Sequence, residues 1–152
     1  MRILFVCLGN ICRSPTAEAA FREAADDAGL DVEVDSAGTG DWHIGEPPDR
    51  RMQSAALEDG LELRGRARQV EPADFERYDL LVAMDRENRR DLQRLAPDAE
   101  AADKIRLFRE YQPDADAPDV PDPYYGGEDG FHEVVRIVRS AAKGLVDELR
   151  QR

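Results

Sequence analysis

Four short apolar runs recur along the chain and are separated by longer segments of mixed polar and apolar character. The runs cover residues 3–6, 32–34, 80–83 and 105–108, and their side chains are β-branched or bulky. Runs of this length and composition are typical of strands in a parallel sheet that is covered on both faces. The pattern therefore predicts four buried strands.

The segments between and after these runs show helical spacing. Small apolar residues share one helical face across residues 17–28, and a further helix is indicated around Leu92. Asp49 is suited to cap a helix that Gly60 ends. The clearest helix comes last, with apolar residues recurring at helical intervals across residues 131–149. Strands that alternate with helices in this way are parallel and joined by right-handed crossovers.

Chain length and composition limit the domain organisation. A chain of 152 residues, 41% of them hydrophobic, is long enough for one packed core and short of the usual size of two domains. We therefore expect a single α/β domain over residues 1–152, with three layers and a central four-stranded parallel sheet flanked by helices. Ligands of such sheets bind beyond the carboxyl ends of the strands.

The sequence also indicates where the protein works. No apolar run approaches the roughly 20 residues that a membrane helix requires, and the first strand begins so early that no room is left for a signal peptide. The two cysteines are too few for the disulfide framework of a secreted protein. We expect a soluble, cytoplasmic protein with no membrane partner. The net charge of −12 argues against nucleic acid binding through phosphate contacts.

The most informative motif follows the first predicted strand. It consists of Cys7, Leu8, Gly9, Asn10, Ile11, Cys12, Arg13 and Ser14. Pro15 comes next and suits the first turn of a helix, where its missing N–H leaves no donor unpaired. The motif is therefore a loop between a strand and a helix, where backbone N–H groups and the helix dipole together favour an anion. A phosphate can be held there without a metal ion.

Within this phosphate-binding loop, the residue types supply the chemistry of phosphoryl transfer. A thiol at a helix N-terminus ionises readily and its thiolate is a nucleophile, which makes Cys7 the candidate. Arg13 offers two parallel N–H donors to phosphate oxygens, and Ser14 can donate to the sulfur when that sulfur leaves. The competing interpretation treats Cys7 as a buried hydrophobic residue and Arg13 as a surface residue. Cys12 is either a small packing residue or a partner that traps oxidised Cys7 as a disulfide.

The loop and several further motifs resemble the low-molecular-weight protein tyrosine phosphatase family over nearly the whole chain. The loop match extends through Pro15, Ala17 and Glu18. The other motifs, in the family's order, are Asp35-Ser36-Ala37-Gly38, Asp41-Trp42 with Gly45 and Pro48-Asp49, Ala67-Arg68-Gln69, Met84-Asp85 with Asn88, and Asp122-Pro123-Tyr124-Tyr125. One position departs from the family. A His tied into the loop network often stands two residues before Ala-Arg-Gln, and this chain has Gly65 there.

The resemblance implies a role for each matching residue of the site. Cys7 is the nucleophile, and Arg13 binds the phosphate together with Ser14 and the loop residues 8–12. Asp122 is the general acid that protonates the leaving tyrosine oxygen and later deprotonates the attacking water. The walls of the crevice are formed by Trp42, Tyr124 and Tyr125. Considered alone, an Asp before a Pro is also a common turn.

Further matching residues are implied to support the loop. Asn10 and Ser36 form a hydrogen-bond pair that stiffens it. Asp85 follows a predicted strand, so it is either a helix N-cap or a support for the phosphate-binding loop. His43 and His132 have no partner Cys or His at ligand spacing, so we interpret both as non-catalytic and expect no metal site.

These features predict an enzyme that hydrolyses phosphotyrosine in proteins through a Cys7 phosphoenzyme, without a cofactor. Its expected partners are phosphotyrosine-containing proteins, including a cognate tyrosine kinase. Three alternatives stay open. A protein arginine phosphatase shares the fold and loop but typically carries Thr where this chain has Ile11, and an arsenate reductase relays electrons through further cysteines, which are missing after Cys12. The third is a catalytically silent phosphopeptide-binding module, against which the joint presence of Cys7, Arg13 and Asp122 argues.

Overall fold

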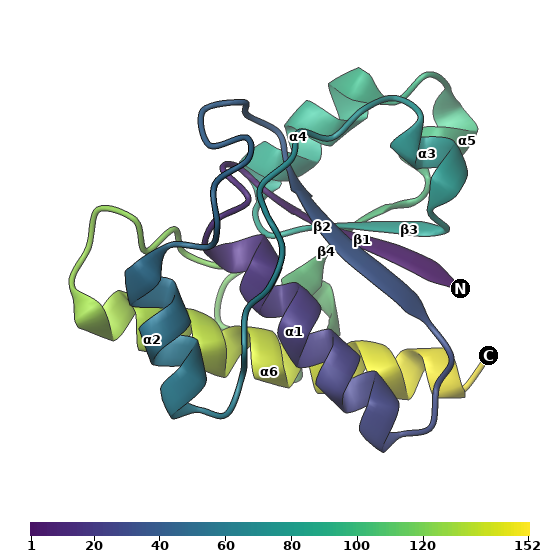
Figure 1. Ribbon diagram of the computed structural model, residues 1–152. Coiled ribbons are helices and arrows are strands. Elements are labelled where there is room, and N and C mark those ends of the chain that lie inside the picture. The colour runs from purple at the N-terminus through teal and green to yellow at the C-terminus, as the bar shows by residue number, and fades with distance from the viewer.

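The computed structural model describes residues 1–152 and contains one parallel sheet (Figure 1). Its strands are β1 (Arg2–Cys7), β2 (Glu33–Gly38), β3 (Leu80–Ala83) and β4 (Ile105–Leu107). They are arranged in the order β2-β1-β3-β4, and every neighbouring pair is parallel. The predicted four-stranded parallel sheet is therefore confirmed.

Helices cover both faces of the sheet, which gives the predicted three layers (Figure 1). One face packs against α1 (Arg13–Asp27), α2 (Arg50–Glu58) and α6 (Glu128–Arg150). The other face packs against α3 (Asp74–Arg77), α4 (Arg86–Leu95) and α5 (Ala99–Ala102). A 3-10 helix, η1 (Phe108–Tyr111), follows β4 directly.

The central strand β1 supplies side chains to both apolar layers because successive residues of a strand point to opposite faces. Ile3 and Phe5 belong to the larger core cluster, together with α1, α2 and α6, and Leu4 and Val6 belong to the smaller cluster under α4. All four side chains are completely buried. This double burial explains why the strand appears in the sequence as an uninterrupted apolar run.

Three of the four strands differ from the predicted runs, and β1 does so by only one residue at each end. The run at residues 32–34 predicts a short strand, but β2 begins at Glu33 and continues to Gly38. The polar residues Asp35 and Ser36 interrupt the apolar pattern over this continuation. Polar residues are tolerated there because β2 is an edge strand and its first residues are only partly buried. The fourth strand ends at Leu107, and Phe108 begins η1.

The predicted helix signals agree with the structure. The side chain of Asp49 accepts hydrogen bonds from the backbone N–H groups of Arg51 and Met52, and so caps α2. Gly60 follows that helix with a φ of 83°, a left-handed conformation that glycine adopts without strain. None of the helices combines the length and the hydrophobicity needed to cross a membrane.

The loop between β1 and α1 lies at the carboxyl end of the central strand. Cys7 is the last residue of β1, and α1 begins at Arg13 after Cys12 as its N-cap residue. Gly38, at the same end of β2, lies so close to this loop that a Cβ atom there would be 2.7 Å from the carbonyl oxygen of Leu8. The absence of a side chain at Gly38 therefore lets the loop lie against the end of β2.

Candidate active site

Two hydrogen-bond donors flank the Cys7 sulfur. The backbone N–H of Asn10 donates to Cys7 Sγ over 3.3 Å, and the hydroxyl of Ser14 lies 3.1 Å from the same sulfur. Asn10 Nδ2 donates to the Ser14 oxygen over 2.8 Å, and the hydrogen of that hydroxyl can point at the sulfur or at the carbonyl oxygen of Ala37, which is 3.5 Å away. The Asn10 N–H, and the Ser14 hydroxyl when it points at the sulfur, stabilise negative charge on Cys7.

Arg13 lies beside the sulfur and is only 3% exposed. Its NH1 donates to Asp85 Oδ2 over 2.6 Å and to the carbonyl oxygen of Val120 over 3.0 Å. Burial by itself would lower the pKa of Arg13, but the charge of Cys7 and the hydrogen bond to Asp85 raise it above its ordinary value. The guanidinium is therefore a fixed positive charge at the centre of an acidic protein.

Asp85 both caps a helix and contacts Arg13, whereas the sequence left these two roles as alternatives. Its Oδ1 accepts from the backbone N–H of Asn88 over 2.7 Å, which caps α4, and its Oδ2 accepts from Arg13. The N-cap geometry holds the carboxylate in one orientation, so the same carboxylate orients the guanidinium of Arg13.

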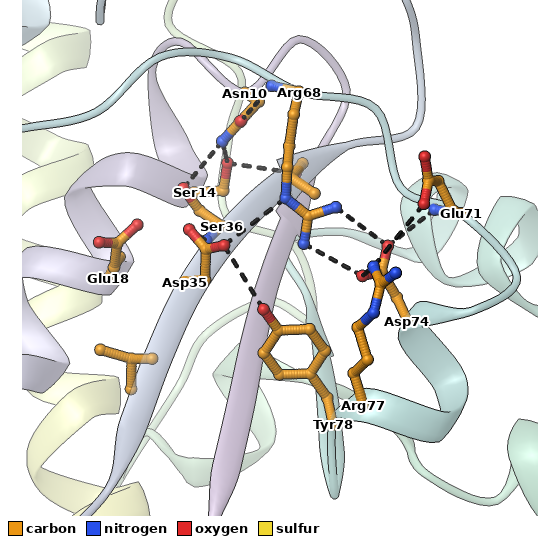
Figure 2. Close-up of polar contacts among 12 residues, drawn as sticks. Asn10, Ser14, Glu18, Asp35, Ser36, Arg68, Glu71, Asp74, Arg77 and Tyr78 are labelled. Carbon is orange, nitrogen blue, oxygen red and sulfur yellow. Dashed lines mark hydrogen bonds and ion pairs between the residues drawn. The ribbon is translucent and has the colours of Figure 1, made fainter.

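The side chain of Asn10 connects the phosphate-binding loop to Ser36 on β2 and to the backbone of Arg68 (Figure 2). Asn10 has a φ of 57°, in the left-handed region, and is only 4% exposed. Its Nδ2 donates to Ser14 and, over 2.9 Å, to Ser36 Oγ on β2, as the resemblance implies. Its Oδ1 accepts from the backbone N–H of Arg68 over 3.0 Å. The family's His is replaced by Gly65, and it is this backbone donor that holds Asn10 from that side.

Asp122 lies near Arg13 and lines the same pocket as Cys7. One of its carboxylate oxygens is 3.7 Å from Arg13 NH2, and the other accepts from the backbone N–H of Tyr124 over 3.1 Å. The side chain is 41% exposed, so it can exchange protons with water. Asp122 can therefore form the Asp-Pro turn and also be available as an acid, because this turn directs its carboxylate into the pocket.

The pocket above the loop has a volume of about 360 Å³. It is lined by Cys7, Leu8, Gly9, Ile11, Cys12, Arg13, Trp42, His43, Asp122, Tyr124 and Tyr125. A sulfur and a guanidinium therefore lie at its base and aromatic rings at its rim. A narrow anion-binding base with apolar walls fits a phosphate carried on an aromatic ring.

A sequence profile of the low molecular weight phosphotyrosine protein phosphatase family matches residues 2–152. The chain belongs to this family. As a member it is a cysteine-dependent protein-tyrosine phosphatase. A relative from Streptomyces coelicolor, named low molecular weight protein-tyrosine-phosphatase, is 50% identical over 154 residues, which cover 99% of this chain and 94% of the relative.

Solved structures of other phosphatases share the fold. A protein tyrosine phosphatase from Entamoeba histolytica, with Hepes in its active site, matches with a TM-score of 0.96 and 38% identity, over 99% of this chain and 97% of that one. A cysteine-to-serine mutant of the arginine phosphatase YwlE, with a phosphorylated active-site serine, matches with a TM-score of 0.89 and 28% identity, over 99% and 97% of the two chains. The fold therefore occurs with both substrate classes and does not by itself select between them.

The rim of the phosphatase pocket is aromatic, as the sequence predicts. Trp42 is 69% exposed and Tyr125 is 94% exposed, so neither ring is part of the core. Tyr124 is half-buried, and its ring meets that of Tyr125 edge-on at 4.9 Å. His43 also lines the pocket, with its ring 5.9 Å from that of Tyr124. Sequence reasoning did not include this histidine in the pocket, because it has no partner at ligand spacing.

Arg51 fixes one of these walls and was also missed by the sequence reasoning. Its guanidinium lies over the ring of Tyr124 at 5.4 Å and over the ring of Phe131 at 4.8 Å. A cation over an aromatic face is attracted by the electron density of the ring. Arg51 thereby connects the Tyr124 wall to the first turns of α2 and α6.

The loop that carries Asp122 is attached to the body of the phosphatase by Arg109. This buried guanidinium, 5% exposed, donates to the carbonyl oxygen of Asp119 over 2.9 Å and to Asp116 over 2.6 Å. The backbone N–H of Val120 also donates to the carbonyl oxygen of Met84 over 2.8 Å. Nothing in the sequence marks Arg109, since its partners come from a loop that has no regular pattern.

We expect Arg109→Met to weaken acid catalysis more than phosphate binding, because the freed loop no longer holds Asp122 in place. The loss in kcat should be roughly ten- to 100-fold on phenyl phosphate, whose leaving group needs a proton. It should be smaller on p-nitrophenyl phosphate, whose leaving group does not. Steady-state kinetics with both substrates measure the ratio, and exposed Arg106 provides the control variant Arg106→Met. Equal losses on both substrates would contradict the role given to Arg109.

Cys12 differs from Cys7 in its surroundings. Both thiols are free, and Cys12 is buried at the N-cap of α1 within the larger core cluster. Burial, together with the nearby charges of Asp49 and Cys7, raises the pKa of the Cys12 thiol far above its ordinary value. A raised pKa favours the protonated thiol at neutral pH, which makes Cys12 a poorer nucleophile than a thiolate. Its packing role agrees with this burial, and trapping of oxidised Cys7 stays a prediction.

Alkylation should distinguish the two thiols. At neutral pH, iodoacetamide is expected to label Cys7 and to leave Cys12 unmodified, because only a thiolate attacks the reagent and Cys12 holds its proton. Inorganic phosphate should slow the labelling, since it occupies the loop above the sulfur. Peptide mapping by mass spectrometry gives the site of modification. Faster labelling of Cys12 than of Cys7 would reverse the assignment.

Proposed function

We propose that the phosphatase hydrolyses phosphotyrosine in proteins through a cysteinyl-phosphate intermediate. The observation that carries the proposal is the convergence of Cys7, Arg13 and Asp122 on one pocket, with the sulfur between the Asn10 N–H and the Ser14 hydroxyl. A nucleophile, a fixed positive charge and a proton donor are the groups that phosphoryl transfer from a phenol requires.

In the first step, the Cys7 thiolate attacks phosphorus, and the sulfur–phosphorus bond forms as the bond to the tyrosine oxygen breaks. Asp122 gives its proton to that oxygen, so the phenol leaves neutral. Arg13 holds two phosphoryl oxygens, and loop amides hold the others. The charge that spreads over these oxygens in the loose transition state is thus already compensated.

In the second step, water attacks the phosphorus of the intermediate, and Asp122 now accepts a proton from that water. The sulfur–phosphorus bond breaks, its electron pair returns to Cys7, and inorganic phosphate is released. Ser14 lowers the cost of this departure by donating to the sulfur. Arg13, Ser14 and the loop amides compensate the charges in this scheme, Asp122 and water exchange the protons, and no cofactor takes part in it.

The walls favour phosphotyrosine as substrate. Trp42, Tyr124 and Tyr125 can contact an aromatic ring above the phosphate, whereas a phosphoserine side chain is too short to reach them. Ile11, 7% exposed in the pocket lining, adds apolar surface where an arginine phosphatase typically carries Thr. An apolar wall suits a phenyl ring better than a guanidinium.

The setting of this activity is part of the proposal. Residues 1–152 act as one catalytic domain, phosphotyrosine proteins are its substrates, and a cognate tyrosine kinase is among them. The cytoplasm fits a catalytic thiol, because the two free cysteines stay reduced there. The net charge of −12 gives phosphoproteins no long-range attraction, so substrate recognition depends on the local charge of Arg13 and the loop amides.

The proposal is tested by comparing hydrolysis of phosphotyrosine and phosphoarginine without added metal, with Cys7→Ser as the blank. We expect much faster turnover of phosphotyrosine and none above background in the blank. Preference for phosphoarginine would replace the tyrosine assignment by the arginine phosphatase alternative. Binding of a phosphotyrosine peptide without release of phosphate would show a silent binding module, and arsenate reduction in the presence of a thiol would show a reductase.

A further inference from the structure

The Asn10 side chain has one partner outside the phosphate-binding loop and β2. Its Oδ1 accepts from the backbone N–H of Arg68, which is 58 residues away in the sequence. The next backbone group of Arg68, its carbonyl oxygen, accepts from the N–H of Gly38 over 2.8 Å. Both contacts come from a segment outside the four strands, which is held through its backbone by a bridge between Gly38 and Gln69 and by hydrogen bonds of Ala67 with Gly45 and Glu46.

The Arg68 side chain adds a second anchor, on Asp74 of α3 (Figure 2). NH1 and NH2 donate to the two carboxylate oxygens of Asp74, each over 3.1 Å, and Nε lies 3.5 Å from Asp35 Oδ2. Tyr78 donates its hydroxyl to that same Asp35 oxygen over 3.4 Å. The guanidinium is therefore held between α3 and β2, in a forked geometry that a lysine cannot reproduce.

The Asp74 carboxylate is completely buried, so its charge needs a partner within the protein. It also accepts from the backbone N–H of Glu71 over 2.7 Å, so the turn that precedes α3 fixes its position as well. Leaving a buried charge without its partner costs much free energy. The Arg68–Asp74 ion pair is therefore expected to stay formed in the folded protein. Arg77 contacts Asp74 too, at 3.5 Å, but it is half-exposed and no hydrogen bond connects it to Asn10.

We propose that Arg68 is a positioning residue for the phosphate-binding loop. Its side chain is anchored on Asp74, and its backbone N–H orients the Asn10 amide. Asn10 in turn presents its own N–H to the Cys7 sulfur and its Nδ2 to Ser14. The chain of contacts leads from a buried ion pair on α3 to the nucleophile. This inference rests on the proposed function of Cys7.

The expected consequence lies in the chemical step. When Arg68 is replaced, its segment keeps the backbone bonds to Gly38 but loses the anchor on α3. The Arg68 N–H can then shift, and the Asn10 amide and the donors around Cys7 are less well aligned for the transition state. We expect kcat to fall roughly ten- to 100-fold in Arg68→Met and phosphate to bind more weakly as a competitive inhibitor. Arg68→Lys keeps the charge near Asp74 without the fork, so it should recover part of the loss.

A double-mutant cycle separates positioning from a general loss of stability. If Arg68 acts through Asn10, then Arg68→Met should cost ten- to 100-fold in the native background and less than about twofold in the Asn10→Ala background. Arg77→Met is the matched control, because it removes the other cation at Asp74 and should leave kcat unchanged. Urea unfolding of each variant confirms that the kinetics are measured on folded protein.

The outcomes decide the proposal. Additive losses in the cycle, or equal losses in Arg68→Met and Arg77→Met, would overturn the positioning role. If Arg68→Met does not fold, the same cycle with Arg68→Lys decides, since the lysine retains a charge beside Asp74. Full activity of Arg68→Met next to an inactive Cys7→Ser would refute only this inference. Activity retained in Cys7→Ser would refute the proposed function itself.

Discussion

Replacing Cys7 by Ser is expected to reduce kcat on p-nitrophenyl phosphate on the order of 10⁶-fold, the scale reached when an enzyme loses its nucleophile. The hydroxyl keeps the shape of the side chain but is not ionised, so nothing in the pocket attacks phosphorus. The donors that hold the anion are unchanged, because Arg13 and the loop amides remain. Inorganic phosphate should therefore still bind, and calorimetric titration measures this while steady-state kinetics measures turnover.

The same experiment identifies which of the two cysteines reacts. Cys12 is buried and its pKa is raised by that burial, so we expect Cys12→Ser to remove no thiolate. If Cys12→Ser abolished turnover while Cys7→Ser retained it, the nucleophile would be assigned to the wrong residue. Loss of phosphate binding in Cys7→Ser would show instead that the substitution had collapsed the loop.

Replacing Asp122 by Ala is expected to cost roughly 10² to 10⁴ in kcat, the usual contribution of general acid–base catalysis. The loss should be largest for phenyl phosphate, since phenolate leaves poorly without a proton. With p-nitrophenyl phosphate the first step is spared and the second is slowed, because water still has to be deprotonated. A series of aryl phosphates with leaving groups of increasing acidity measures this dependence on the leaving group.

Asp129 offers a control for the loss of one negative charge near the pocket. It is an exposed carboxylate in the first turn of α6, and it does not line the pocket. Asp129→Ala should leave the leaving-group dependence of the native enzyme in place. An Asp122→Ala variant with the native leaving-group dependence would exclude Asp122 as the proton donor.

Local pattern was sufficient to predict most of the fold. The run at residues 3–6 is apolar because β1 is central and covered on both faces, so the strand was visible without its partners. The second strand was underestimated, because Asp35 and Ser36 interrupt the apolar pattern at the edge of the sheet. Ser36 is polar there because it bonds Asn10, a contact that brings together residues 26 positions apart.

The site divides in a similar way. The residues of the phosphate-binding loop are contiguous, so their chemistry could be predicted from a single stretch of sequence. Arg68 and Arg109 could not be found in this way, because each acts through partners on other elements, and arginines are common in this chain. Asp85 was predicted with two alternative contacts and makes both, since its two carboxylate oxygens face different donors.

The covalent intermediate on Cys7 is the step on which the proposed mechanism depends. In Asp122→Ala, p-nitrophenyl phosphate should still phosphorylate Cys7, while hydrolysis of the intermediate is slow because water has lost its base. The time course of p-nitrophenol release should therefore show a stoichiometric burst. Mass spectrometry of the acid-quenched protein should find a phosphoryl group on the Cys7 peptide. Release of p-nitrophenol with no phosphoryl group on the protein, or with the group on another residue, would contradict the mechanism.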